Sequence, residues 1–100
     1  MKIISATLAA DAIHALGAEA PGCRALFSSF AAGLRVPAEG VSKHDEIEIS
    51  LILSGAFELD SGGEVARLEA GDLVIVPPGE THSFRVLADT KIFTVTVAAT

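Results

Sequence analysis

The segment that most constrains the fold is residues 71–82, which read G-D-L-V-I-V-P-P-G-E-T-H. A glycine opens a turn, a short apolar run follows as a strand, and Pro77-Pro78-Gly79 imposes a second turn. His82 comes three residues after that last glycine. A histidine so close to a rigid turn is held at a fixed angle, as a metal ligand or an acid–base group requires. The simpler alternative is that His82 only satisfies backbone groups of the turn.

Most of the chain reads as short strands separated by turns that contain glycine or proline. The expected strands are 24–32, 47–59, 65–68, 73–76, 83–87 and 91–97, with a hairpin turn at 60–63 and Asp89 in the turn before the last strand. Closely spaced short strands indicate an all-β sandwich or barrel. Residues 7–18 are instead rich in alanine, with apolar residues at helical spacing. We therefore expect a short helix there, within an N-terminal extension over 1–22.

Composition narrows the classes of partner. The 100 residues predict a single domain, and the apolar half of them is ample for one core. A net charge of −6, without a cluster of Lys or Arg, argues against nucleic acid or an anionic membrane as a partner. No apolar run is long enough for a transmembrane helix. Cys23 is the only cysteine, and Asp11 and His14 interrupt the apolar start, so we expect a cytoplasmic protein without a signal peptide.

Two motifs resemble those of the cupin family. Residues 71–82 match the family's second motif, G-x5-P-x-G-x2-H, up to the histidine, but the usual asparagine four residues later is Val86. The first motif, roughly G-x5-H-x-H-x3,4-E-x6-G, is only partly kept, with its opening glycine displaced. Counting back from Gly55 places its glutamate at Glu48 and its second histidine at His44.

The first histidine of that motif falls on Ser42. The resemblance covers about residues 33–97 and implies a small single-domain cupin with a jelly-roll barrel.

The resemblance further implies that His44, Glu48 and His82 converge in the barrel mouth as ligands of a divalent metal ion, which could be Fe, Mn, Zn or Ni. Two imidazoles and one carboxylate form many open metal sites, with positions left for water, substrate or oxygen. Ser42 shares strand parity with His44 and Glu48, but its hydroxyl is a poor ligand and would at most bond a bound water. The expected pocket wall consists of Ser42, Ser50, Ile52, Phe84 and Val86.

Taken without the resemblance, Glu48 is most simply on the solvent face of an alternating strand, and His44 is an ordinary loop histidine. If Glu48 instead faces inward, four large aliphatic side chains of the same strand must face outward: Ile47, Ile49, Leu51 and Leu53. Such an exposed stripe is a liability or an interface. We therefore expect a second subunit of a homodimer, the 7–18 helix, or both, to cover it.

Three functions are compatible with these residues. The first is a metal-dependent enzyme of oxygenase, isomerase or lyase type that acts on an unknown small molecule. The second is a metal-free binding or sensing module without catalysis. Residues 44–55 also resemble the effector-binding domain of AraC-type regulators, although no helix-turn-helix is expected in these 100 residues, and Ser42 favours this alternative. The third is metal-free acid–base catalysis by His44 or His82, as in sugar epimerases of this fold.

Overall fold

The computed structural model of the chain describes residues 11–15 and 21–99. Within these residues the regular elements are all strands, and no helix is long and apolar enough to cross a membrane. The strands are β1 (Asp11–Ala15), β2 (Cys23–Phe30), β3 (Arg35–Val36), β4 (Glu46–Ser61), β5 (Glu64–Glu69), β6 (Leu73–Val76) and β7 (His82–Ala98). They form one seven-stranded sheet in which every pairing is antiparallel.

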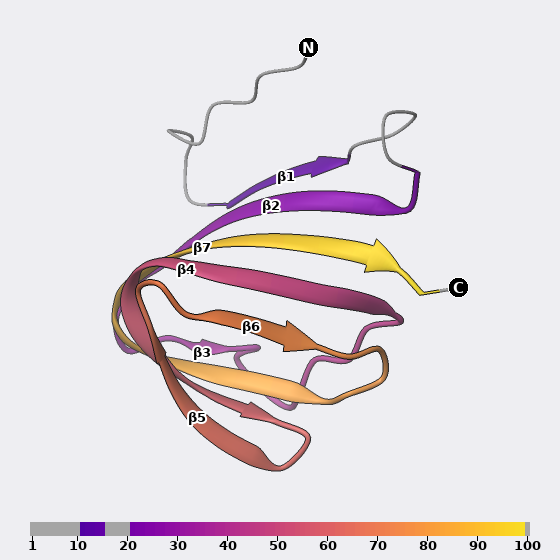
Figure 1. The fold of residues 1–100 in the computed structure, drawn as a ribbon. Coiled ribbons are helices and arrows are strands. Elements are labelled where there is room, and N and C mark those ends of the chain that lie inside the picture. The colour runs from indigo at the N-terminus through magenta and orange to yellow at the C-terminus, as the bar shows by residue number, and fades with distance from the viewer. Residues whose placement is uncertain (1–10, 16–20, 100) are drawn as a thin grey trace.

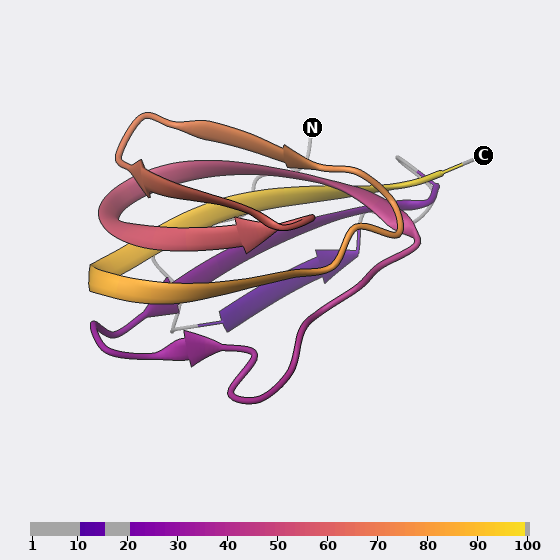
Figure 2. The same ribbon diagram turned by 90° about the horizontal axis from the view of Figure 1, so that it is seen from below.

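The sheet folds back on itself into two layers, because its two longest strands, β4 and β7, bend and run through both (Figure 1). In the front layer, the first half of β4 pairs with β6, the second half of β7 pairs with β2, and β1 extends the layer from β2. In the back layer, the other halves of β4 and β7 pair with β5 and β3. Figure 2 shows both long strands curling round at the bend, where the two layers are joined.

Gly55 makes the bend in β4 sterically feasible. Its φ is +89°, and a Cβ at this position would overlap the carbonyl oxygen of Asp89 and the Thr90 hydroxyl on β7. Only glycine allows the two strands to approach this closely. The buried Thr90 hydroxyl then fastens the bend, accepting a hydrogen bond from Ala56 N at 3.2 Å and donating one to Ala88 O at 2.7 Å.

The N-terminal helix expected over residues 7–18 is not seen. Asp11–Ala15 form strand β1, which pairs with β2 from Asp11↔Ser28 to Ala15↔Arg24, so the prediction is wrong for these five residues. The remaining parts of that range, 7–10 and 16–18, lie outside the described residues. Helix propensity is a weak prior, and pairing with a neighbouring strand overrides it here.

The expected closed barrel is also corrected, because the sheet is open on the side away from the bend. Among the described strands, none of the front layer pairs with an edge strand of the back layer across that side. Only β4 and β7 are long enough to cross between the layers. The edge strands β3, β5 and β6 have two, six and four residues, and each stays in one layer.

The strands expected at 83–87 and 91–97 are a single strand, β7, and Asp89 lies inside it and not in a turn. The reason is that β7 pairs with β4 on both sides of the bend, so the strand bends without ending. The Asp89 carboxylate accepts a hydrogen bond from Ala32 N at 2.9 Å, which ties the segment after β2 to the bend.

The hydrophobic core fills the space between the layers near the bend. Its buried cluster consists of Ile52, Phe57, Leu59 and Ile92, with Phe30, Leu68, Val74 and Phe84 packed against it. The aromatic members contact one another, with ring centroids 5.2 Å apart for Phe30 and Phe84 and 5.1 Å apart for Phe57 and Phe84. Beyond this core, the layers enclose a cavity.

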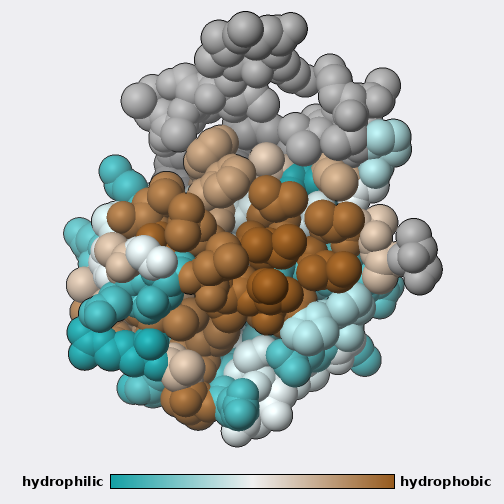
Figure 3. Space-filling view, viewed as in Figure 1, coloured by the Kyte–Doolittle hydropathy of each residue, from teal (hydrophilic) through white to brown (hydrophobic). Residues whose placement is uncertain are grey.

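The convex side of the front layer carries a continuous set of aliphatic and aromatic side chains, which we call the outer apolar face. Cross-strand pairing sets Ile49 between Ile75 and Val95, and Leu51 between Leu73 and Phe93. Leu73 and Ile75 remain 59% and 58% exposed, and Leu53 and Leu51 also remain exposed. Figure 3 shows apolar side chains gathered over the middle of the molecule, where β4 and β6 lie in Figure 1.

Candidate metal centre

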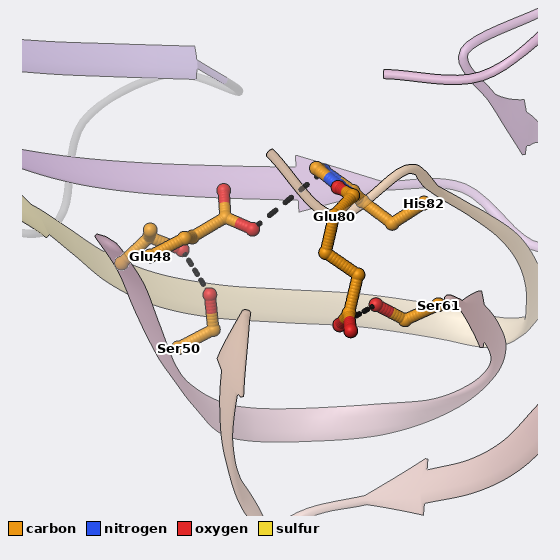
Figure 4. Close-up of polar contacts among 6 residues, drawn as sticks. Glu48, Ser50, Ser61, Glu80 and His82 are labelled. Carbon is orange, nitrogen blue, oxygen red and sulfur yellow. Dashed lines mark hydrogen bonds and ion pairs between the residues drawn. The ribbon is translucent and has the colours of Figure 1, made fainter. Parts of the chain in front are cut away.

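Three ligand-type side chains from different parts of the chain meet at the mouth of the cavity. His44 lies in the loop before β4, Glu48 on β4, and His82 at the start of β7. One ligand atom from each lies within 4.8 Å of the other two. Glu48 Oε2 is 3.7 Å from His82 Nε2, and Figure 4 shows these two side chains pointing toward one another. The structure thus brings together the three residues that the sequence resemblance selected.

Backbone hydrogen bonds fix the positions of both histidines. Ser42 and His82 form an antiparallel bridge in which each N–H donates to the other's carbonyl, at 2.8 Å and 2.9 Å. The N–H of Gly79 donates to the carbonyl of His44 at 2.8 Å. The Pro-Gly turn that precedes His82 therefore also holds the loop that carries His44. This is the structural reason why a turn at 77–79 accompanies the two histidines.

The surroundings of His82 determine which ring nitrogen is free. Its side chain is buried, and its Nδ1 lies 3.2 Å from the carbonyl oxygen of Glu80. A carbonyl can only accept, so Nδ1 is the donor in this contact, and Nε2 is the ring nitrogen that faces Glu48. The Glu80 carboxylate accepts a hydrogen bond from the Ser61 hydroxyl at 2.7 Å and is turned away from the site (Figure 4). A protonated Nδ1 on a carbonyl is the arrangement that orients a metal-binding imidazole.

A second carboxylate, Glu46, lies two residues before Glu48 but is already engaged. Arg24 Nη2 donates to Glu46 Oε2 at 2.6 Å, in a pair that is largely exposed. The hydrogen bonds from Arg24 and Thr96 lower the pKa of the Glu46 carboxyl. Among the described residues Glu48 has no Lys or Arg partner, and its contact with an ionisable side chain is the one with His82. Of the two carboxylates, Glu48 is therefore the one available as a ligand.

The cavity behind the three side chains has a volume of about 200 Å³ and is lined mainly by apolar residues. Its lining consists of Leu26, Ser28, Phe30, Val36, Ser42, His44, Glu48, Ser50, Phe57, Leu59, Val74, Val76, His82, Phe84, Ile92 and Thr94. Of the five residues expected to form the wall, Ser42, Ser50 and Phe84 line it. Ile52 and Val86 do not, because each is 1% exposed and packed toward the bend.

Sequence reasoning selected Ser50 for the pocket wall but missed Thr94, whose hydroxyl pairs with that of Ser50 in this cavity. Ser50 Oγ and Thr94 Oγ1 lie 2.7 Å apart on paired positions of β4 and β7, and both side chains are buried. The pattern that could have revealed Thr94 is the alternation along 92–97. Ile92, Thr94 and Thr96 take one face of the strand and Phe93, Val95 and Val97 the other. On this strand Ile92 and the two threonines point inward, and Phe93, Val95 and Val97 point outward.

The chain is an antiparallel β-sandwich with two histidines and one glutamate at the mouth of an internal cavity. These features define the class of protein to which it is compared. The cupin domain family model matches residues 34–98, so the chain belongs to the cupin family, and the resemblance in its motifs is confirmed. A search among curated proteins gave no match.

Solved structures show the same fold. A cupin protein from Bacteroides fragilis is 24% identical with a TM-score of 0.82, and the match covers 98% of this chain and 84% of that one. The Cnp3 cupin domain of Schizosaccharomyces pombe is 18% identical with a TM-score of 0.77, covering 89% of this chain and 64% of that one.

A variant of salicylate 1,2-dioxygenase from Pseudoaminobacter salicylatoxidans is 22% identical with a TM-score of 0.70. That match covers 77% of this chain but only 22% of the dioxygenase, so the chain corresponds to a small part of that enzyme.

Proposed function

We propose that this chain binds one divalent metal ion through His44, Glu48 and His82, and that the loaded site binds a small molecule in the cavity behind it. The observation that carries the proposal is the convergence of the three ligand atoms within 4.8 Å, with the Nε2 of His82 facing Glu48. Metal–ligand bonds of about 2.0–2.2 Å require a slightly tighter set. His44 is the exposed member of the three, so its side chain is the one with room to move toward the other two.

The donor set is compatible with Fe, Mn, Zn or Ni, since imidazole and carboxylate ligands suit all four. When bound, such a metal supplies Lewis-acid or oxygen-activating chemistry, of the kind used by oxygenases, isomerases and lyases. The protein's own residues orient the ligands, through the Glu80 carbonyl and the Ser42 bridge, and they line the cavity mainly with apolar side chains. One structural neighbour is a dioxygenase, and another structure of that enzyme contains gentisate. This similarity supports a small-molecule ligand.

The test is metal content by inductively coupled plasma mass spectrometry, on tag-free protein purified without chelator and then incubated with Fe, Mn, Zn or Ni. We expect about one metal per chain in the wild type and none retained by His82→Ala. A circular dichroism spectrum of the variant checks that it is folded. Equal metal content in the two proteins, or none in either, would rule out this site.

A metal-free binding or sensing module is the second candidate, and one observation favours it. Ser42 stands where the family motif has a histidine, and its bridge to His82 sets it directly beside the candidate ligands. A hydroxyl there adds little to metal affinity. The discriminating experiment is ligand binding by chelator-treated protein. Affinity that does not depend on metal, without turnover, supports this alternative.

We also propose that the chain is a cytoplasmic homodimer that pairs through the outer apolar face. With Ala25 and Phe27 of β2, which pair with Val95 and Phe93, that face spans four strands about 4.8 Å apart and about six residues at 3.3 Å each. Its projected area is therefore roughly 400 Å², within a factor of about two of the 800 Å² that each partner buries in a standard interface.

Charge favours a second copy as the partner of this face. Two copies, each of net charge −6, repel one another, and no acidic side chain is among the residues that form the outer apolar face, which the cationic Lys91 borders on β7. A second copy of the chain meets least repulsion there.

A further inference from the structure

The size of the cavity limits what it can hold. Its volume of about 200 Å³ is below the range of drug-sized pockets, which begins at about 300 Å³. A cavity of about 150 Å³ lined by aliphatic and aromatic side chains holds one benzene molecule. Leu26, Phe30, Leu59, Phe84 and Ile92 provide such a lining here. The body of a matching ligand is therefore apolar and about the size of one six-membered ring.

The charges around the cavity limit the charge of the ligand. No Lys or Arg is among the described residues that line it, and its single acidic residue is Glu48. A divalent ion beside one carboxylate leaves one net positive charge, which neutralises one anionic group of a ligand. A second carboxylate, or a phosphate, would be buried without a cation, and that is costly.

The Ser50 and Thr94 hydroxyls provide a second polar anchor. Each hydroxyl has one proton, and only one of the two protons is used in the 2.7 Å hydrogen bond between them. The described residues offer no acceptor for the other. Ser50 follows Glu48 by two residues on the same face of β4, which sets their Cα atoms about 7 Å apart. A ring with one substituent at each end spans that distance.

We infer that the cavity takes a monoanion with an apolar body about one six-membered ring in size, whose charged head lies at the metal centre and whose neutral acceptor oxygen lies on the Ser50–Thr94 hydroxyl pair. The position of the head rests on the proposed function. The apolar body and the hydroxyl anchor rest only on the shape and lining of the cavity. The cavity excludes dianions and phosphate esters of similar length.

The experiment uses three probes that share a benzoate ring and differ only at the far end. That end carries a hydroxyl in 4-hydroxybenzoate, a hydrogen in benzoate and a second carboxylate in terephthalate. Dissociation constants are measured by calorimetry on Zn-loaded protein, and methyl NMR of Leu59 and Ile92 locates the binding. We expect 4-hydroxybenzoate to bind about fivefold more tightly than benzoate, as one hydrogen bond predicts. Terephthalate should bind at least about a hundredfold more weakly, because its second carboxylate has no cation.

The double variant Ser50→Ala/Thr94→Val removes both hydroxyls and should abolish the preference for 4-hydroxybenzoate over benzoate. Ser29→Ala, on the neighbouring strand β2 and outside the cavity lining, is the control and should keep the preference. Terephthalate binding as tightly as benzoate, or a preference that survives in the double variant, overturns the inference. So does a Zn-loaded protein whose cavity methyl signals respond to none of the probes.

A neutral ring, 4-methylphenol, separates this inference from the proposed function. If the chain binds no metal, the proposed metal centre fails, and the cavity is then tested by 4-methylphenol on the metal-free protein. Binding that shifts the cavity methyl signals and weakens in the double variant supports the apolar body and the hydroxyl anchor. Absence of binding overturns them.

Discussion

At the scale of single residues, the candidate site depends on which polar groups are already engaged elsewhere. Glu46 is bonded to Arg24, the Nδ1 of His82 is bonded to the Glu80 carbonyl, and the Glu80 carboxylate is bonded to Ser61. Each of these contacts removes a competing donor or acceptor. The atoms left for a metal are those of Glu48, His44 and the Nε2 of His82.

Replacing Glu48 and Glu46 separately tests this assignment. Glu48→Gln should weaken Zn²⁺ binding by on the order of tenfold to a hundredfold or more, because it removes the only anionic ligand of the set. Glu46→Gln makes the same chemical change two residues away and should alter the affinity little, since Glu46 faces Arg24. Calorimetric titration with Zn²⁺ measures both variants. Similar losses in the two would show that general negative charge, and not a coordinating Glu48, attracts the ion.

Restoring the missing histidine is the complementary test. Ser42 lies opposite His82 in a bridged pair and lines the cavity, so Ser42→His adds a fourth ligand next to the existing three. We expect metal affinity to rise about tenfold or more, because four protein ligands complete a closed coordination shell. Ser83→His adds the same imidazole to the opposite face of β7 and serves as control. An unchanged affinity in Ser42→His would count against the site geometry.

At the scale of elements, the fold depends on the bend shared by β4 and β7. Between the two layers, the core lies next to this bend and the cavity lies farther from it. Both strands continue through it because Gly55 removes a steric obstacle and Thr90 replaces the backbone hydrogen bonds that the bulges interrupt. The bend therefore links a local backbone requirement to the position of the site.

Alanine substitutions at two glycines distinguish the cost of steric overlap at the bend from the cost of a positive φ angle. Gly55 and Gly63 have similar φ values, +89° and +85°, but nothing lies within 4 Å of a Cβ added at Gly63. Gly63→Ala should cost about 1–2 kcal/mol in the free energy of unfolding, from the positive φ alone. Gly55→Ala should cost more than about 4 kcal/mol, because the added methyl group also overlaps β7. Urea unfolding monitored by circular dichroism measures both, and equal costs would contradict this account of the bend.

The sequence predicted elements well where turn residues mark both ends. The strand expected at 73–76 coincides with β6, which lies between the Gly71 turn and the Pro77-Pro78-Gly79 turn. Alanine content and spacing predict a helix over residues 11–15, but these residues pair with the edge of β2 as a strand. Local composition carries no information about that pairing, so the prediction fails there. Motif spacing selected His44, Glu48 and His82. Parity alone did not distinguish Ser50, which lines the cavity, from Ile52, which lies deeper toward the bend.

At the scale of the whole molecule, the inward face of β4 and the outer apolar face are two consequences of one alternation. Because Glu48 and Ser50 face the cavity, Ile49 and Leu51 must face outward, and Leu73 and Ile75 of β6 extend the apolar surface beside them. A chain that uses its inward positions for polar site residues therefore has an apolar surface to cover. The expectation of a second subunit on this face remains a prediction.

Two lysine substitutions, one in the front layer and one in the back layer, test that prediction. Ile75 and Val65 are similarly exposed, at 58% and 62%, but Ile75 lies on the outer apolar face and Val65 on β5 of the back layer. In a two-fold dimer through the outer apolar face, Ile75→Lys buries two unpaired charges, one from each copy. The dissociation constant of the dimer should therefore rise at least about a hundredfold. Sedimentation equilibrium should therefore give a dimer for wild type and Val65→Lys and a monomer for Ile75→Lys. A monomeric wild type would show that this face is not an interface between copies of the chain, and a dimer that tolerates Ile75→Lys would place the interface elsewhere.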